Sequence, residues 1–266
     1  MSRIAQAFEA LHQRGEKALV TFLTAGDPDL ATSEQVIHTL VEAGVDLLEL
    51  GFPFSDPMAD GPTIQAASER ALASGTTLRG VLDMVTRVRQ HTNVPIVLMG
   101  YFNPVFRYGA EAFARDAAAA GVDGLLLVDL PPEEAGELHP QLKAVGIDLI
   151  TLLAPTTPEA RMVRLAAAAE GFLYYVSMTG VTGTQKVDAA AIADAVARVR
   201  RESQVPVAVG FGVATPDDAR AVAAFADAVV VGSALVQVIA AHGRSPTLLE
   251  EVLVFARSLK KAVGSP

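Results

Sequence analysis

The stretch EAGVDLLEL, residues 42–50, joins a helix end, a glycine, an acidic residue and a short apolar run. The same unit recurs as AAGVDGLLLV at residues 119–128 and as AVGIDLITLL at residues 144–153. Looser copies are AEGFLYYV at residues 169–176 and AFADAVVVG at residues 224–232. A repeat of this kind predicts helices that end at a glycine and lead directly into buried strands.

Apolar runs continue along the whole chain and predict eight strands. Each run is almost continuous rather than alternating, which is typical of parallel strands covered on both faces. The predicted strands are residues 18–24, 46–50, 95–100, 124–128, 148–153, 172–176, 206–210 and 228–231, and helical patterns between them include residues 31–43, 76–91, 109–120, 158–169 and 188–201.

Eight strand–helix units favour the α/β class and, within it, a (β/α)8 TIM barrel. The doubly wound parallel sheet is the alternative, but it fits a smaller number of strands. Near the start of the chain, Ile4, Ala7, Phe8 and Leu11 fall on one helical face, which predicts an extra N-terminal helix. Because no low-complexity linker divides the sequence, we expect residues 1–266 to form a single barrel domain.

The composition limits the partners and the location that we expect. The formal net charge is −9 and there is no basic run, which argues against nucleic acid and anionic membrane as partners. The start of the chain lacks an apolar core of signal-peptide length, and no apolar stretch could span a bilayer. We therefore expect a cytoplasmic protein. The absence of cysteine excludes disulfides, thiolate metal sites and a cysteine nucleophile.

Glu49 is the first candidate catalytic residue, because chemistry in this fold is confined to the C-terminal ends of the strands. The alternation of a strand directs Leu47 and Glu49 into the barrel and Leu48 and Leu50 toward the helices. Burying an ionisable group without a partner costs several kcal/mol, so an acid or base role is the favoured interpretation. The alternative is a glutamate paired with a neighbouring hydroxyl or lysine in the barrel core.

Asp60 is the second candidate, in the loop SDPMADGP at residues 55–62. Aspartate before glycine is ordinary turn chemistry, so this residue alone would carry little weight. In a loop that folds over the same rim as Glu49, however, the two carboxyl groups are a plausible acid–base pair.

A phosphate site is expected at the last two strands. Gly210-Phe211-Gly212 follows the seventh strand, and Gly232-Ser233 follows the eighth and begins a short helix. Loops at these two positions, together with a helix N-terminus, form the recurring phosphate site of such barrels.

The remaining polar residues argue for proton transfer without a cofactor. The five lysines include none at a strand end, which disfavours a Schiff base. The five histidines are helical or peripheral, so we expect no catalytic metal. A nucleotide-binding glycine pattern is absent from the first strand–helix turn.

Seven segments together resemble one family, the alpha subunit of tryptophan synthase. The stretch LELGFPFSDPMADGPTIQ at residues 48–65 is the longest and most specific of them. The others are FLTAGDPD (22–29), MGYFNPVFRYG (99–109), DLPPEE (129–134), VTGT (181–184), GFGV (210–213) and GSALV (232–236).

The resemblance implies a lyase that cleaves indole-3-glycerol phosphate to indole and glyceraldehyde 3-phosphate. It also implies a heterotetramer with a beta subunit that receives the indole and holds pyridoxal phosphate, with no cofactor in this chain. Two alternatives remain open, namely another phosphate-binding barrel enzyme of the tryptophan pathway and a non-catalytic activator of a partner subunit.

The resemblance further implies a role for individual residues. Glu49 would be the general acid and base, and Asp60 would hydrogen-bond the indole N–H and stabilise its developing charge. Tyr174 would orient Glu49 or the substrate, whereas Tyr175 would face the helices. Thr182 and Gly183 would belong to a loop that closes over the site. Met178 stands where many members carry a basic residue, which leaves the electrostatics between this loop and the partner open. The implied substrate-binding residues are Phe22, Tyr101, Tyr174, Thr182, Gly183, Gly210, Phe211, Gly212, Gly232 and Ser233, and the implied partner surface includes Pro53, Asp56 and Pro57.

Overall fold

The computed structural model describes residues 2–176, 189–210 and 212–264, and its strands form one sheet in which neighbouring strands are parallel. The strand order is β5-β4-β3-β2-β1-β9-β8-β7-β6, so the first and last strands of the chain are neighbours. The strands are β1 Ala18–Thr24, β2 Leu47–Gly51, β3 Ile96–Gly100, β4 Gly124–Leu127, β5 Asp148–Leu149, β6 Thr151–Leu153, β7 Leu173–Val176, β8 Val207–Gly210 and β9 Ala228–Val231.

The two ends of this sheet are consecutive in the chain, which nearly closes the barrel. β5 and β6 are the halves of the predicted strand 148–153, and Ile150 alone separates them. β5 pairs with β4, whereas β6 pairs with β7, so each half bonds to a different neighbour. The described residues therefore contain nine strands where the sequence predicts eight, and the (β/α)8 class is confirmed against the doubly wound alternative.

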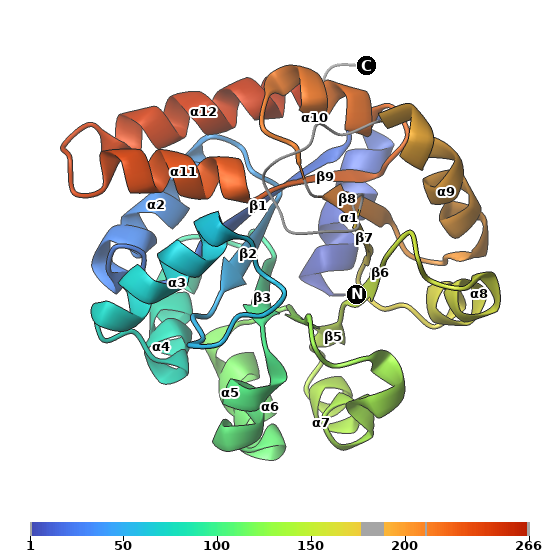
Figure 1. Ribbon diagram of the computed structural model, residues 1–266, viewed down its shortest axis with the longest axis horizontal. Helices are drawn as coiled ribbons and strands as arrows, with labels where there is room; N and C mark the ends of the chain where they lie inside the picture. Colours follow the sequence, from blue (N-terminus) through green and yellow to red (C-terminus); the bar gives the residue numbers. More distant parts are fainter. Residues whose placement is uncertain (1, 177–188, 211, 265–266) are drawn as a thin grey trace.

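Helices surround the strands, as Figure 1 shows. The five predicted helical segments are confirmed to within two residues, and Gly121, Gly146 and Gly171 at the predicted helix ends have φ of +92°, +77° and +64°. The helices are α1 Arg3–Gln13, α2 Leu30–Glu42, α3 Pro62–Ala73, α4 Leu78–Arg89, α5 Phe102–Tyr108, α6 Ala110–Ala120, the 3-10 helix η1 Pro132–Glu137, α7 His139–Ala144, α8 Glu159–Ala167, α9 Ala189–Glu202, α10 Pro216–Ala223, α11 Ser233–His242 and α12 Leu248–Val263.

Two apolar layers follow from the alternation of the strands. Leu48 and Leu50 belong to the outer layer between the sheet and the helices. Leu47 belongs to the inner layer, together with Val97 and Leu126 from the next two strands. The predicted directions of Leu47, Leu48 and Leu50 are therefore confirmed.

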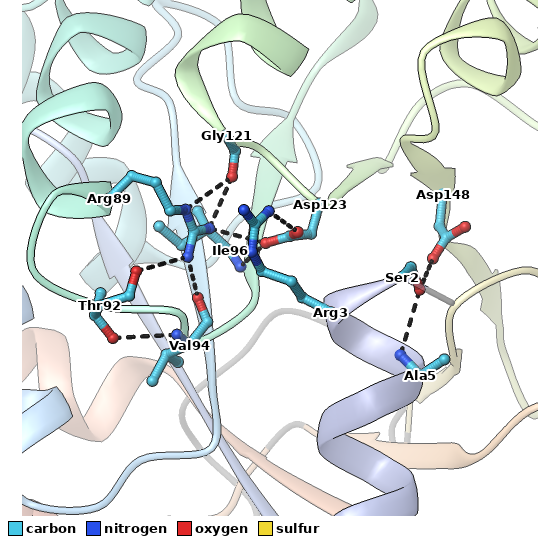
Figure 2. Close-up of polar contacts among 10 residues, drawn as sticks. All are labelled: Ser2, Arg3, Ala5, Arg89, Thr92, Val94, Ile96, Gly121, Asp123 and Asp148. Carbon is cyan, nitrogen blue, oxygen red and sulfur yellow. Dashed lines mark hydrogen bonds and ion pairs between the residues drawn. The ribbon is translucent and has the colours of Figure 1, made fainter.

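Helix α1 packs against the N-terminal end of the barrel, as the predicted extra helix. Its residues Ile4, Phe8 and Leu11 are buried in the inner layer. Polar contacts at the same end hold it in place, since Arg3 pairs with Asp123 at 2.9 Å and Ser2 Oγ donates to Asp148 at 3.1 Å (Figure 2). Helix α1 thus covers this end, and the opposite rim is the end at which this fold carries its chemistry.

The part of the chain that the structure describes holds no helix long and apolar enough to cross a membrane.

The packing of α1 generates a stability prediction. Phe8 is 7% exposed and its ring centroid lies 6.1 Å from that of Phe172. Phe8→Ala should lower the free energy of unfolding by about 3 kcal/mol, because it leaves a cavity in the inner layer. The matched control is Phe106→Ala on α5, whose side chain is 63% exposed and which should change stability by less than about 0.5 kcal/mol. Equal effects of the two substitutions in urea unfolding would contradict the packing role of α1.

Candidate active site

Glu49 lies on β2 inside the barrel, between Phe22 on β1 and Val97 on β3 in the strand register. It has the same parity as Leu47, which packs in the inner layer. The residue is 1% exposed. The predicted inward direction of this carboxyl group is therefore confirmed.

The Glu49 carboxyl group is buried, and one of its oxygens lacks a partner among the described residues. Its Oε1 atom has no hydrogen-bond partner among the described residues. Burial raises the pKa of Glu49 to about 8, and no other cause of comparable size acts on it. The carboxyl group is consequently neutral at pH 7. For Oε1, this finding contradicts the alternative in which Glu49 is paired with a lysine or a hydroxyl group in the barrel core.

Tyr174 lies in the same electrostatic environment as Glu49. Burial, and next the charge of Glu49, hold the pKa of Tyr174 well above its usual value. Tyr174 belongs to the inner layer and Tyr175 to the outer layer, as expected for the two adjacent tyrosines. A Cβ atom at Gly210 would collide with the Tyr174 hydroxyl, so a glycine at the end of β8 makes room for this ring.

Asp60 lies at the rim, directly before α3. Burial raises the pKa of Asp60 to about 6, and a hydrogen bond with Tyr101 partly opposes this rise. The Tyr101 hydroxyl also accepts from the Ala59 N–H at 2.9 Å, which attaches the loop to the end of β3. Neutral pH thus lies between the pKa values of Asp60 and Glu49.

A small cavity of about 20 Å³ marks the rim between these elements. Asp60, Phe22 and Tyr101, which the family resemblance implies for the substrate site, all line it. Glu49 does not line it and lies one inward position below Gly51, which does. Its lining residues are Phe22, Thr24, Gly51, Phe52, Phe54, Asp60, Ile64, Ser68, Met99, Gly100, Tyr101 and Val128.

Two glycines that line the cavity, Gly51 and Gly100, are not among the site residues predicted from the sequence. A Cβ at Gly51 would lie 2.6 Å from the ring of Phe22, and a Cβ at Gly100 would collide with the ring of Phe52. Both glycines end strands, and both stand beside aromatic residues in the chain. That juxtaposition was the available signal, but only the barrel register reveals which ring each glycine accommodates.

The ends of β8 and β9 hold the described part of the expected phosphate site. Gly210 ends β8, and Gly232 precedes Ser233, the first residue of α11. These strands are neighbours in the sheet, so the two ends meet at one point of the rim. The first N–H groups of α11 have no acceptor within their own helix, and its N-terminus carries a partial positive charge there. Gly212 follows with φ of +80°.

Several predicted residues lie outside the described part of the chain. They are Met178, Thr182, Gly183 and Phe211. The expected partner residues are described. Asp56 is exposed and Pro57 half-buried, whereas Pro53 is buried within the chain and offers little area of its own.

The other hollows and the acidic and histidine side chains of the described residues are weaker candidates for an active site. Two larger hollows, of about 730 and 900 Å³, lie at the N-terminal end beside α1, far along the barrel from Glu49. Their walls mix acidic and basic side chains without a common charge. The described histidines, aspartates and glutamates form no cluster of three or more that could hold a metal ion.

Comparison with known proteins agrees with the resemblance of the sequence. The alpha chain of tryptophan synthase from Geobacter sulfurreducens is 56% identical over 265 residues, covering 100% of each chain. The crystal structure of the alpha subunit from Legionella pneumophila has a TM-score of 0.91 at 40% identity and covers 99% of this chain and 98% of that chain. A chain of Mycobacterium tuberculosis tryptophan synthase has a TM-score of 0.91 at 37% identity, covering 100% and 99%.

The sequence model of the family described as "Tryptophan synthase alpha chain" matches residues 8–264. With the match extending over nearly the whole chain, and relatives of this identity covered in full, the chain belongs to the tryptophan synthase alpha chain family.

Proposed function

We propose that Glu49 and Asp60 supply the acid–base chemistry with which this chain cleaves indole-3-glycerol phosphate to indole and glyceraldehyde 3-phosphate, the reaction of its family. The observation that carries this assignment is the Glu49 carboxyl group. It is 1% exposed, its Oε1 is unpartnered among the described residues, and its pKa is raised to about 8. Such a group is a proton donor at neutral pH.

The cleavage begins and ends with Glu49 protonated. The carboxyl group gives its proton to C3 of the indole ring, which places a positive charge on the ring nitrogen. The bond from C3 to the side chain then breaks, and its electron pair restores the aromatic ring. The hydroxyl group on the departing carbon loses its proton to the Glu49 carboxylate as that carbon becomes an aldehyde. Protons and electrons balance without a further reagent.

Asp60 stabilises the charge that develops on the ring nitrogen. With a pKa of about 6, its carboxyl group is mostly ionised at pH 7, whereas Glu49 is mostly protonated. Two carboxyl groups whose pKa values are pushed apart in this way can act as a stabilising anion and a proton donor on one substrate.

The remaining rim residues hold the two ends of the substrate. Phe22 and Tyr101 line the cavity beside Asp60 and offer aromatic faces to the indole ring. Gly232 and Ser233 bind the phosphate through the N-terminus of α11, with Gly210 and Gly212 beside them. Tyr174 orients the Glu49 carboxyl or the substrate. Thr182, Gly183 and Phe211 complete the pocket, an assignment that rests on the family resemblance.

The chain works with the beta subunit of tryptophan synthase, as its family does. We place part of the contact at Asp56 and Pro57, which are accessible, with Pro53 shaping the loop from within. Pyridoxal phosphate belongs to the beta subunit in this assignment. A phosphate monoester does not cross a bilayer unaided, so a cytoplasmic location fits the substrate.

The role of Glu49 can be tested by substitution. Glu49→Gln should fold and bind substrate but release indole roughly 10²- to 10⁴-fold more slowly, because the amide cannot exchange a proton. Glu111→Gln on the exposed start of α6 is the matched control and should leave the rate unchanged. Turnover by Glu49→Gln at the rate of the parent chain would exclude the proposed mechanism.

The role of Asp60 can be tested in the same way. Asp60→Asn should lower kcat for indole release by about 10²-fold, because the developing charge loses its counter-charge. Steady-state kinetics in the presence of the beta subunit is the measurement. A loss of less than about threefold would reduce Asp60 to a structural part of its loop.

The raised pKa of Glu49 also predicts a pH dependence of stability. In the folded chain the pKa of Glu49 is about 8, above its ordinary value of 4.5. The unfolded chain therefore releases this proton first, and the contribution of Glu49 to stability is lost as pH rises from about 4.5 to about 8. The free energy of unfolding of the parent chain minus that of Glu49→Gln should fall by up to about 1.4 kcal/mol per pH unit in this window and level off above it. A difference that stays constant from pH 5 to pH 8 would contradict the raised pKa.

A further inference from the structure

We propose that the ion pair between Asp27 and Arg70 positions the carboxylate of Asp60, by fixing helix α3 on the end of strand β1. The inference rests on the proposed role of Asp60 in the reaction. It assigns Asp27 and Arg70 as positioning residues, since neither lines the cavity at the rim.

Asp27 and Arg70 are joined by two hydrogen bonds, which fix the orientation of the pair. Arg70 Nε donates to Asp27 Oδ1 at 2.7 Å, and Arg70 Nη2 donates to Asp27 Oδ2 at 2.8 Å. The Asp27 side chain is 2% exposed, whereas that of Arg70 is 38% exposed. Two parallel bonds between a planar guanidinium and a buried carboxylate fix orientation as well as distance, which a single contact does not.

Asp27 and Arg70 lie on two segments that position residues of the candidate site at the rim. Asp27 follows the end of β1, the strand that bears Phe22. Arg70 lies on α3, the helix that begins two residues after Asp60. Ser74, at the end of the same helix, adds a contact from its hydroxyl to the Gly26 carbonyl at 3.3 Å. The C-terminal half of α3 is thus held on the segment that follows β1.

The other half of α3 reaches the site directly. Ile64 and Ala67 pack with Phe22 in one small apolar cluster. The side chain of Gln65 donates from Nε2 to the Asp60 carbonyl at 2.8 Å. A rotation or shift of α3 would therefore move the backbone of Asp60 and the wall of the pocket together. The Asp27–Arg70 pair sets the register of the helix on which both depend.

A second buried ion pair allows the positioning role to be separated from stability. Arg89 donates from Nη2 to Asp123 Oδ2 at 2.8 Å, with side chains 12% and 5% exposed. Figure 2 shows this pair at the N-terminal end of the barrel, where Arg89 also donates to the Gly121 carbonyl. Neither Arg89 nor Asp123 lines the cavity at the rim. Arg89→Lys is consequently a control with the same chemical change at the opposite end.

The experiment compares Arg70→Lys with Arg89→Lys in the full chain, with the beta subunit present. Both substitutions keep the charge. Arg70→Lys loses the two-bond geometry with Asp27, and Arg89→Lys loses the single bond to Asp123 together with guanidinium bonds to backbone carbonyls, so both should lower the unfolding midpoint in urea. Arg70→Lys alone should lower kcat for indole release, by about tenfold, with KM changed less than about twofold, because a small displacement of a catalytic group acts on the chemical step. Asp27→Asn provides the same comparison from the other side of the pair, should Arg70→Lys fail to fold.

The decisive arm repeats Arg70→Lys in the Asp60→Asn background. If Arg70 acts through Asp60, its effect on kcat should disappear there, since the two changes then remove one contribution. A kcat of Arg70→Lys within twofold of the parent, or an effect of full size in the Asp60→Asn background, would overturn the inference. Full activity of Asp60→Asn alone would instead overturn the proposed function, so the two failures are distinguishable.

Discussion

The burial of one carboxyl group, that of Glu49, is the constraint around which the site is organised. Among the described residues nothing bonds to its Oε1 atom, and the surrounding inner layer is apolar. An ionised carboxylate would be costly there, so the group holds its proton to a pKa of about 8. The apolar layer that stabilises the barrel is thus also what prepares the acid. Stability and reactivity at this position have the same physical origin.

The two ends of the barrel differ in role: side chains pack at the N-terminal end, and the candidate site lies at the C-terminal end. At the N-terminal end, α1 covers the inner layer, and the Arg3–Asp123 ion pair holds it there. At the C-terminal end, aromatic rings reach the rim because glycines at positions 51, 100 and 210 leave room for them. One end of the barrel is thus covered by a packed helix, and the other presents the residues of the candidate site. The proposed link from Asp27 through Arg70 to Asp60 extends this logic to a helix of the rim.

Much of the fold could be predicted from the sequence because its determinants are local. The repeat of glycine, acidic residue and apolar run locates the strands, and simple alternation turns Glu49 inward. What could not be predicted depends on contacts distant in sequence. The break at Ile150 arises because β5 and β6 pair with different neighbours. The fit of Gly100 to the ring of Phe52 depends likewise on the barrel register.

The site was predicted in part, for the same reason. Glu49 could be predicted because a carboxyl group is unusual within an apolar strand. Asp60 could be predicted because it lies in the loop that follows that strand. The part that α3 plays has no such signal, because Arg70 looks like any half-exposed helix residue until its partner Asp27 is known. The residues at the rim that came from family resemblance, such as Tyr101, acquire a physical reason only in three dimensions. Its hydroxyl accepts the Ala59 N–H and so holds the loop of Asp60.

The central claim, a neutral carboxyl group inside the barrel, is open to direct observation by infrared spectroscopy. The carbonyl stretch of a protonated carboxylic acid can be followed with pH in the parent chain, with Glu49→Gln as the reference. A band present at pH 6, absent in Glu49→Gln and lost with a midpoint near pH 8 is the predicted result. A Glu49 that is already ionised at pH 6, with a midpoint near the ordinary value of 4.5, would contradict the account.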